Sequence, residues 1–252
     1  MGKRIIYIVC HNDASEKIAH EHFSKYSWAR IYRIPDESQT YLMESVMYHT
    51  ELMKVYDEWK DAEIVGTLSY KLPSRFIGWN DNGNIQELSN YIIKDVKPDN
   101  GIYGIKSYYS VLLENTPIVY NVIRDTCKTL GITITQRENY NIINRKFNTT
   151  SYLDTKLFIF HNYWMTTPST MLKYIEFFNK QWLPALELHP DVWKNSNYQY
   201  DNFTSSQSNK DLMLKLSNGR VDYYPCHATS SERIPTLWCL HNSIIYHSLY
   251  PK

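Results

Sequence analysis

The chain has 252 residues, 43% of them hydrophobic and 21% charged, and its 27 Lys and Arg nearly balance 26 Asp and Glu, for a formal net charge of +1. This composition is close to the globular average and excludes a disordered, collagen-like or disulfide-scaffold protein. The near-neutral charge argues against a nucleic-acid partner, because such binding needs a basic face that releases counterions from phosphates. We therefore expect a globular enzyme or a binding domain.

The sequence predicts a cytoplasmic protein with no transmembrane segment. The apolar run at residues 5–10 is shorter than the ~7–15 residues of a signal-peptide core, and no run approaches the ~18 residues of a membrane span. The four cysteines lie far apart and without zinc-finger spacing, which favours reduced thiols. The 22 tyrosines either supply rings for stacking on sugars and bases or reflect the AT-rich genome of a bacterium or a large DNA virus.

The first 68 residues alternate between expected strands and helices. Short apolar runs predict strands at 5–10, 29–34 and 64–68. Asp13-Ala14-Ser15-Glu16 has the pattern of a capping box that begins a helix to about residue 26, and apolar residues at helical spacing predict one long helix over about 41–60. This alternation predicts a parallel sheet with right-handed crossovers.

The rest of the chain continues the pattern less regularly. Residues 136–152 and 189–210 are polar and predict loops. No repeat or linker divides the chain, so we predict one α/β domain over residues 1–252, with a mostly parallel central sheet flanked by helices. Its further strands are expected at 101–105, 156–164 and 221–224, and its further helices at about 116–130, 167–183 and 235–249.

Ligands bind open α/β sheets beyond the carboxyl ends of the strands, and candidate site residues follow three of the expected strands. After the first strand, the candidates for contact with the base or ribose of a nucleotide are Cys10, His11 and Asn12, and the alternative is a helix cap. After the third strand, the candidates are Ser69, Tyr70, Lys71 and Arg75, whose cations would bind a diphosphate, and the alternative is solvated surface charge. Late in the strand at 156–164, the candidates for hydrogen bonds to an acceptor and stacking on it are His161, Asn162, Tyr163 and Trp164, and the alternative is core packing.

Several catalytic motifs are absent from the sequence. It contains no GxGxxG, P-loop, GxSxG or HExxH, and the missing GxGxxG argues against NAD-dependent chemistry. No Asp-x-Asp follows a strand in the first half, where many nucleotide-sugar transferases hold a divalent metal. Asp81 is a weak substitute and is more typical of a turn.

Two segments resemble the DUF4422 family of glycosyltransferase-like proteins. Residues 51–60 and 62–71, with Gly66 and Tyr70, resemble the family block ELTALYWAWKN…ADYIGLCHYRRYF, and residues 231–238 resemble SERLLNVWL near the family's C-terminus. Residues 160–165 occupy the place of the family's YNMFIM strand, and the blocks occur in the same order. The chain departs from the family at residues 69–72, where Ser-Tyr-Lys-Leu replaces His-Tyr-Arg-Arg, and at Pro235, which interrupts the last block.

The resemblance implies a GT-A-like (Rossmann-like) glycosyltransferase whose residues 1–135 bind the nucleotide-diphosphate sugar and whose residues 136–252 bind a glycan acceptor. Glu232 would act as the general base, with Arg233 beside it. The alternative is that residues 229–232 form a capping box. A Mg²⁺ or Mn²⁺ ion would be held mainly by the donor diphosphate, with help from His227 or Asp81.

Two other classes of protein stay open at this point. The high content of aromatic residues and the missing Asp-x-Asp would also suit a carbohydrate-binding module without catalysis. The same layered sheet would suit a methyltransferase or a nucleotidyltransferase, since a fold does not determine a function.

Overall fold

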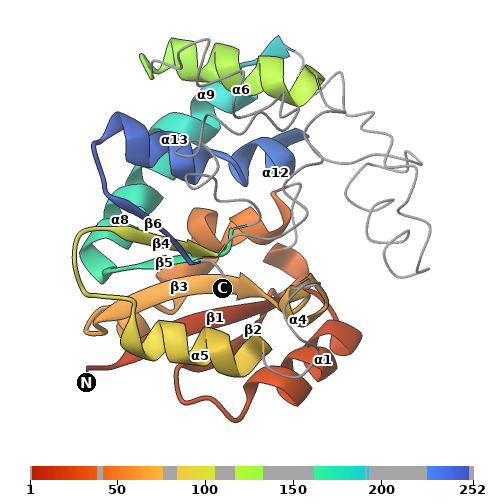
Figure 1. Ribbon diagram of the computed structural model, residues 1–252. Coiled ribbons are helices and arrows are strands. Elements are labelled where there is room, and N and C mark those ends of the chain that lie inside the picture. Colours follow the sequence, from red (N-terminus) through yellow and green to blue (C-terminus); the bar gives the residue numbers. More distant parts are fainter. Residues whose placement is uncertain are drawn as a thin grey trace, which may run out of the picture.

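The computed structural model describes residues 2–38, 42–75, 84–105, 117–132, 162–190, 192 and 226–249. A six-stranded sheet lies at the centre, with helices on both of its faces (Figure 1). The expected α/β class is therefore confirmed. The strands are β1 (Arg4–Cys10), β2 (Ala29–Arg33), β3 (Ile64–Ser69), β4 (Ile102–Ile105), β5 (Trp164–Thr166) and β6 (Tyr246–Leu249).

The sheet is mixed, with the order β2-β1-β3-β5-β4-β6. β1 pairs in parallel with β2 and β3, and β4 pairs in parallel with β6. β5 is antiparallel to both of its neighbours, β3 and β4. The prediction of a mostly parallel sheet is thus confirmed only in part, because a reversed strand from late in the chain separates β3 from β4.

Gly66 allows this reversed strand to approach β3. A Cβ atom at position 66 would lie 2.5 Å from the Cβ of Met165 and 2.6 Å from the carbonyl oxygen of Trp164. Cβ atoms in proteins essentially never come this close to other heavy atoms, so a larger side chain would push β5 away from β3. The glycine therefore has a packing role at the centre of the sheet.

The helices form two layers. One layer holds α1 (Asp13–Phe23), α4 (Leu72–Arg75) and α5 (Asn84–Lys94), and it shares a buried cluster with one face of the strands. The other layer lies on the opposite face of the sheet and includes α8 (Pro168–Phe177), α12 (Cys226–Ser231) and α13 (Ile234–His241). Beyond these helices, farther from the sheet, lie α6 (Pro117–Thr129) and α9 (Leu183–Glu187), and α6 contacts both α12 and α9. Alternate residues of β1 enter the two clusters, because successive side chains of a strand point to opposite faces.

The N-cap of the expected helix after β1 lies one residue earlier than predicted. Asn12, not Asp13, is the N-cap: its side chain accepts a hydrogen bond from the backbone N–H of Ser15 at 2.9 Å, and the Ser15 hydroxyl accepts one from the backbone N–H of Asn12 at 2.9 Å. This reciprocal pair is a capping box in which serine stands in the place of glutamate. Asp13 instead forms an ion pair with Arg33.

The predicted long helix over about 41–60 is broken into short turns. It consists of η2 (Met43–Ser45), the π-helical η3 (Met47–Glu51), α2 (Leu52–Lys54) and α3 (Tyr56–Trp59). Side chains replace some of the lost backbone bonds: Trp59 Nε1 donates to the carbonyl of Leu52 at 2.8 Å, and Asn179 Nδ2 donates to that of Tyr48 at 3.0 Å. Asn179 lies outside the predicted helix, and Trp59 lies seven residues from Leu52. The apolar spacing within residues 41–60 therefore did not reveal the breaks.

Two further helix boundaries differ from the prediction. After α8 the chain continues through the π-helical η6 (Phe178–Trp182) into α9, because Pro184 lies in the first turn of α9, where its missing N–H is tolerated. The predicted helix over 235–249 is wrong beyond His241: Ser243 has a φ of 54°, which ends α13, and β6 follows. The segments expected over 136–152, 156–161 and 221–224 lie outside the described residues.

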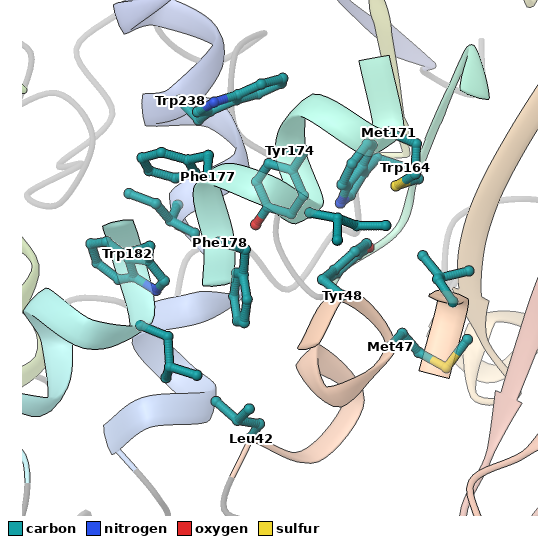
Figure 2. Close-up of a cluster of buried hydrophobic side chains, with 14 of the residues drawn as sticks. Leu42, Met47, Tyr48, Trp164, Met171, Tyr174, Phe177, Phe178, Trp182 and Trp238 are labelled. Carbon is teal, nitrogen blue, oxygen red and sulfur yellow. The ribbon is translucent and has the colours of Figure 1, made fainter. Parts of the chain in front are cut away.

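Aromatic side chains fill the larger cluster. The ring of Tyr48 stacks on that of Trp164 with centroids 5.2 Å apart, and Tyr174 meets Trp164 edge-on at 4.9 Å. Phe178, Trp182 and Trp238 extend the cluster toward α13 (Figure 2). Much of the unusual aromatic content of the chain is therefore part of the core.

Candidate functional site

The two strands that follow β1 along the chain, β2 and β3, lie on opposite sides of β1 in the sheet. The carboxyl ends of β1 and β3 therefore form a topological switch point. Four side chains gather there, and we call them the switch-point cluster: His11, Glu44, Tyr70 and Lys71. His11 Nε2 lies 3.5 Å from Glu44 Oε1. The His11 ring meets the edge of Tyr70 at 6.3 Å, and Lys71 Nζ lies 5.5 Å from the centre of the Tyr70 ring.

The switch-point cluster combines a cation, a carboxylate, an imidazole and a phenol at one edge of the sheet. The side chains of His11 and Glu44 are only 10% and 14% exposed, so their interaction is stronger than that of a pair in open solvent. Sequence reasoning singled out His11, Tyr70 and Lys71 but missed Glu44. No motif marks Glu44, because it lies in η2, which the sequence predicted as the middle of a long helix.

Three of the expected nucleotide-binding residues have local structural roles. Cys10 is buried in the core, and its burial raises the pKa of the thiol to about 12, so the thiol stays protonated. Asn12 caps α1, which is the alternative function expected for this turn. The Ser69 hydroxyl accepts the backbone N–H of Lys71 at 3.3 Å and thereby shapes the turn after β3.

The reversed strand brings a fourth segment to the same edge. Because β5 is antiparallel, its amino end lies beside the carboxyl end of β3, and Asn162 lies just before it. The carbonyl oxygen of Asn162 accepts a hydrogen bond from Thr67 Oγ1 at 2.6 Å, and its Nδ2 donates to Ser45 Oγ at 3.1 Å. The structure thus unites residues far apart in the sequence around Asn162.

The two aromatic residues after Asn162 are wholly inside the protein. Tyr163 is 1% exposed and Trp164 is 0% exposed, and both belong to the buried clusters. A ring enclosed on both faces by protein offers no face to a sugar. In this structure Tyr163 and Trp164 have a packing role, which is the alternative considered for them.

The predicted catalytic pair lies in the turn between α12 and α13. Glu232 is 7% exposed, and its backbone N–H donates to the carbonyl of Ala228 at 2.9 Å; the N–H of Arg233 donates to that of Ser230 at 3.1 Å. The capping-box alternative is wrong, because residues 229–231 lie inside α12 and Glu232 follows its last turn. α12 packs against η2, which carries Glu44, and this contact brings the C-terminal segment toward the switch point.

His227, a candidate metal ligand, lies in α12 and is 0% exposed. Burial lowers the pKa of its imidazole to about 4, so the ring is neutral at pH 7. Mg²⁺ and Mn²⁺ need several oxygen ligands, and within the described ranges no group of three His, Cys, Asp or Glu side chains comes together. The residues described around His227 therefore do not fit such an ion.

The buried imidazole makes the stability of the protein depend on pH. Between about pH 6.5 and 4 the unfolded chain binds a proton at position 227 that the native protein does not, so stability falls as the pH decreases. This loss should amount to about 3 kcal/mol, and His227→Gln should remove most of it. Urea unfolding at pH 7 and pH 4.5 tests this expectation, with the exposed His20→Gln as control. An unchanged pH dependence in His227→Gln would contradict it.

Three other predicted site residues lie wholly or partly outside the described structure. Asp81 and His161 are not among the described residues. Arg75 ends α4, but its side chain is not described. Their predicted contacts with a metal, an acceptor and a diphosphate stay predictions.

The residues that carry the family resemblance are largely structural. Glu51 is 0% exposed, and its carboxylate accepts hydrogen bonds from Tyr32, Thr50 and Lys54 at 2.7–2.8 Å. Burial alone would raise the pKa of Glu51, but these hydrogen bonds outweigh burial and lower it. Ser231 likewise accepts Trp182 Nε1 at 3.1 Å. These blocks therefore bear on the fold more directly than on chemistry.

Comparisons with known proteins add no relative: no family model, no curated protein and no solved structure matches this chain. Among the described helices, none is long and apolar enough to cross a membrane.

Proposed function

We propose that this protein is a GT-A-like glycosyltransferase that moves a sugar from a nucleotide-diphosphate sugar to a hydroxyl group of a glycan acceptor. The observation that carries the proposal is the switch-point cluster at the carboxyl ends of β1 and β3. Apart from the reversed β5, the order β2-β1-β3-β4 is that of doubly wound sheets, which bind nucleotides at such a point. The resemblance to glycosyltransferase-like proteins favours a sugar nucleotide over other nucleotides.

Each part of the donor would have a partner at this edge. Lys71, with Arg75, would bind the diphosphate, because negative charge develops there as the glycosidic bond breaks. His11 and Tyr70 would meet the nucleoside. A Mg²⁺ or Mn²⁺ ion, when bound, would neutralise the diphosphate and be held mainly by its oxygens.

The acceptor hydroxyl needs a base if the configuration of the sugar is inverted. Glu232 would take its proton, with Arg233 beside it in the sequence. The contact between α12 and η2 supports this assignment, since it brings the segment of Glu232 toward the side of the sheet that holds Glu44 and His11.

A thermal-shift screen of UDP-, GDP- and dTDP-sugars, with and without Mn²⁺, tests the proposal, because a ligand of the folded state raises its stability. At least one nucleotide sugar should stabilise the protein and be hydrolysed slowly in water without an acceptor. Binding without hydrolysis or transfer would indicate a carbohydrate-binding module. Stabilisation by S-adenosylmethionine or a nucleoside triphosphate instead would indicate a methyltransferase or a nucleotidyltransferase.

Lys71→Ala should weaken binding of the donor nucleotide by about ten-fold or more, because it removes a charge-assisted contact with the diphosphate. Isothermal titration with the nucleoside diphosphate that performs best in the screen measures this change. Lys94→Ala is the matched control, since Lys94 is exposed at the end of α5. That end of α5 lies near the amino end of β1, where Arg4 donates to the carbonyl of Val96. Equal affinities for Lys71→Ala and the wild type would remove Lys71 from the diphosphate site.

A further inference from the structure

Asn162 has an unusual environment for a buried residue. It is 3% exposed and has a φ of 54°, in the left-handed region that residues other than glycine rarely adopt. One end of its side-chain amide faces Ser45 Oγ. The other end, Oδ1, is buried and has no hydrogen-bond partner among the described residues.

The backbone of Asn162 is held in this conformation by a directed chain of hydrogen bonds. A carbonyl can only accept, so Thr67 Oγ1 donates to the carbonyl of Asn162 at 2.6 Å. The Thr67 hydroxyl has a single proton, so Tyr48 donates to Thr67 Oγ1, also at 2.6 Å. Residues that their surroundings hold in a rarely populated backbone conformation are concentrated at active and ligand-binding sites.

Asn162 also lies next to the proposed diphosphate site. The register of β3 and β5 ends at Thr67 opposite Trp164, and Asn162 lies two residues beyond that pair, toward the end of β3. Lys71 follows in the turn after β3, and Ser45, which holds the Asn162 amide, is adjacent to Glu44 of the switch-point cluster. A sugar attached to a diphosphate at Lys71 would therefore lie near the β3–β5 edge.

We infer that the unpartnered end of the Asn162 amide, opposite the end that faces Ser45, binds a hydroxyl group of the transferred sugar. This inference rests on the proposed function and moves Asn162 from the acceptor to the donor sugar. Ser45 can donate or accept, so the unpartnered end is the oxygen in this structure and would be the nitrogen if the amide were reversed. A hydroxyl group both donates and accepts, so it suits either orientation, whereas a phosphate oxygen suits only one.

The test compares each nucleotide sugar with its nucleoside diphosphate alone, using UDP-glucose, UDP-galactose, GDP-mannose and dTDP-glucose. Asn162→Gly is the informative variant, because glycine adopts a positive φ without strain and removes the amide. It should bind the diphosphate as the wild type does and lose about ten-fold in affinity for the sugar nucleotide, the effect of one buried hydrogen bond. Its melting temperature should equal or exceed that of the wild type.

Ser45→Ala provides a matched comparison of stability. It removes the same hydrogen bond but leaves the buried amide without its inner partner, so its melting temperature should fall below that of Asn162→Gly. If Asn162→Gly is unfolded, or loses several degrees more than Ser45→Ala, the amide is a structural brace and the inference is overturned.

The binding results separate the inference from the proposed function. Equal affinity of Asn162→Gly and the wild type for the sugar nucleotides overturns the inference and leaves the proposed function standing. A wild type that binds no nucleotide sugar overturns both. Selective loss of sugar-nucleotide affinity, with the diphosphate affinity and the melting temperature retained, supports the inference.

Discussion

Glu232→Gln should reduce turnover by about 10²–10⁴-fold while donor binding stays unchanged, because glutamine cannot accept the proton of the acceptor hydroxyl. Glutamine has nearly the shape of glutamate and keeps one side-chain oxygen that can accept hydrogen bonds. The variant should therefore fold normally. Turnover is measured with the nucleotide sugar found in the screen, and donor affinity by titration.

Glu176→Gln is the control for this substitution, since Glu176 is an exposed carboxylate of α8 that pairs with Lys180 on the surface. Near-full turnover in Glu232→Gln would make Glu232 a structural residue, and the base would then be sought at Asp154 or Asp201, which lie outside the described residues. Retention of the sugar's configuration, read by NMR of the product anomer, would make a simple deprotonating carboxylate unnecessary.

Trp164→Ala should lower the free energy of unfolding by about 3–5 kcal/mol, the range measured for large aromatic residues truncated in a core. Trp164 is wholly buried, stacks on Tyr48 and meets Tyr174 edge-on, so its removal leaves a cavity between β5 and the helical layer (Figure 2). Urea unfolding followed by circular dichroism measures the change.

Leu188→Ala is the matched control for the core substitution, because Leu188 is 83% exposed and its truncation should change stability by no more than ~0.5 kcal/mol. A loss below about 1 kcal/mol in Trp164→Ala would mean that the neighbouring rings close over the gap.

The strands β1 to β4 were the most predictable part of the fold. β1 and β3 are buried on both faces, and their continuous apolar runs are distinctive in the sequence. The helical segment before β3 was predicted as one helix because apolar spacing does not record where a helix changes to a π-turn. The groups that accommodate those turns, such as Asn179 opposite Tyr48, come from distant parts of the chain.

The candidate site was predictable only where it follows a parallel strand. His11, Tyr70 and Lys71 were found because residues after β1 and β3 must meet at one edge of the sheet. The direction of β5 was not predictable, since its residues read equally well in either orientation, and so the convergence of Asn162 with Ser45 and Thr67 was not foreseen. Glu44 was missed because it lies in η2, one of the short turns that the sequence predicted as part of a single helix.

The place of β5 in the sheet also determines when folding can be completed during synthesis. β1, β2 and β3 can associate once residues 4–69 have been made, but β4 joins that sheet only through β5, a strand of three residues that emerges much later. Until then β4 has no neighbour on that side, and an unpaired strand edge is prone to pair with other chains. We therefore expect a chain halted before residue 162 to aggregate, and the full-length chain to fold slowly, because its last pairings span long stretches of sequence.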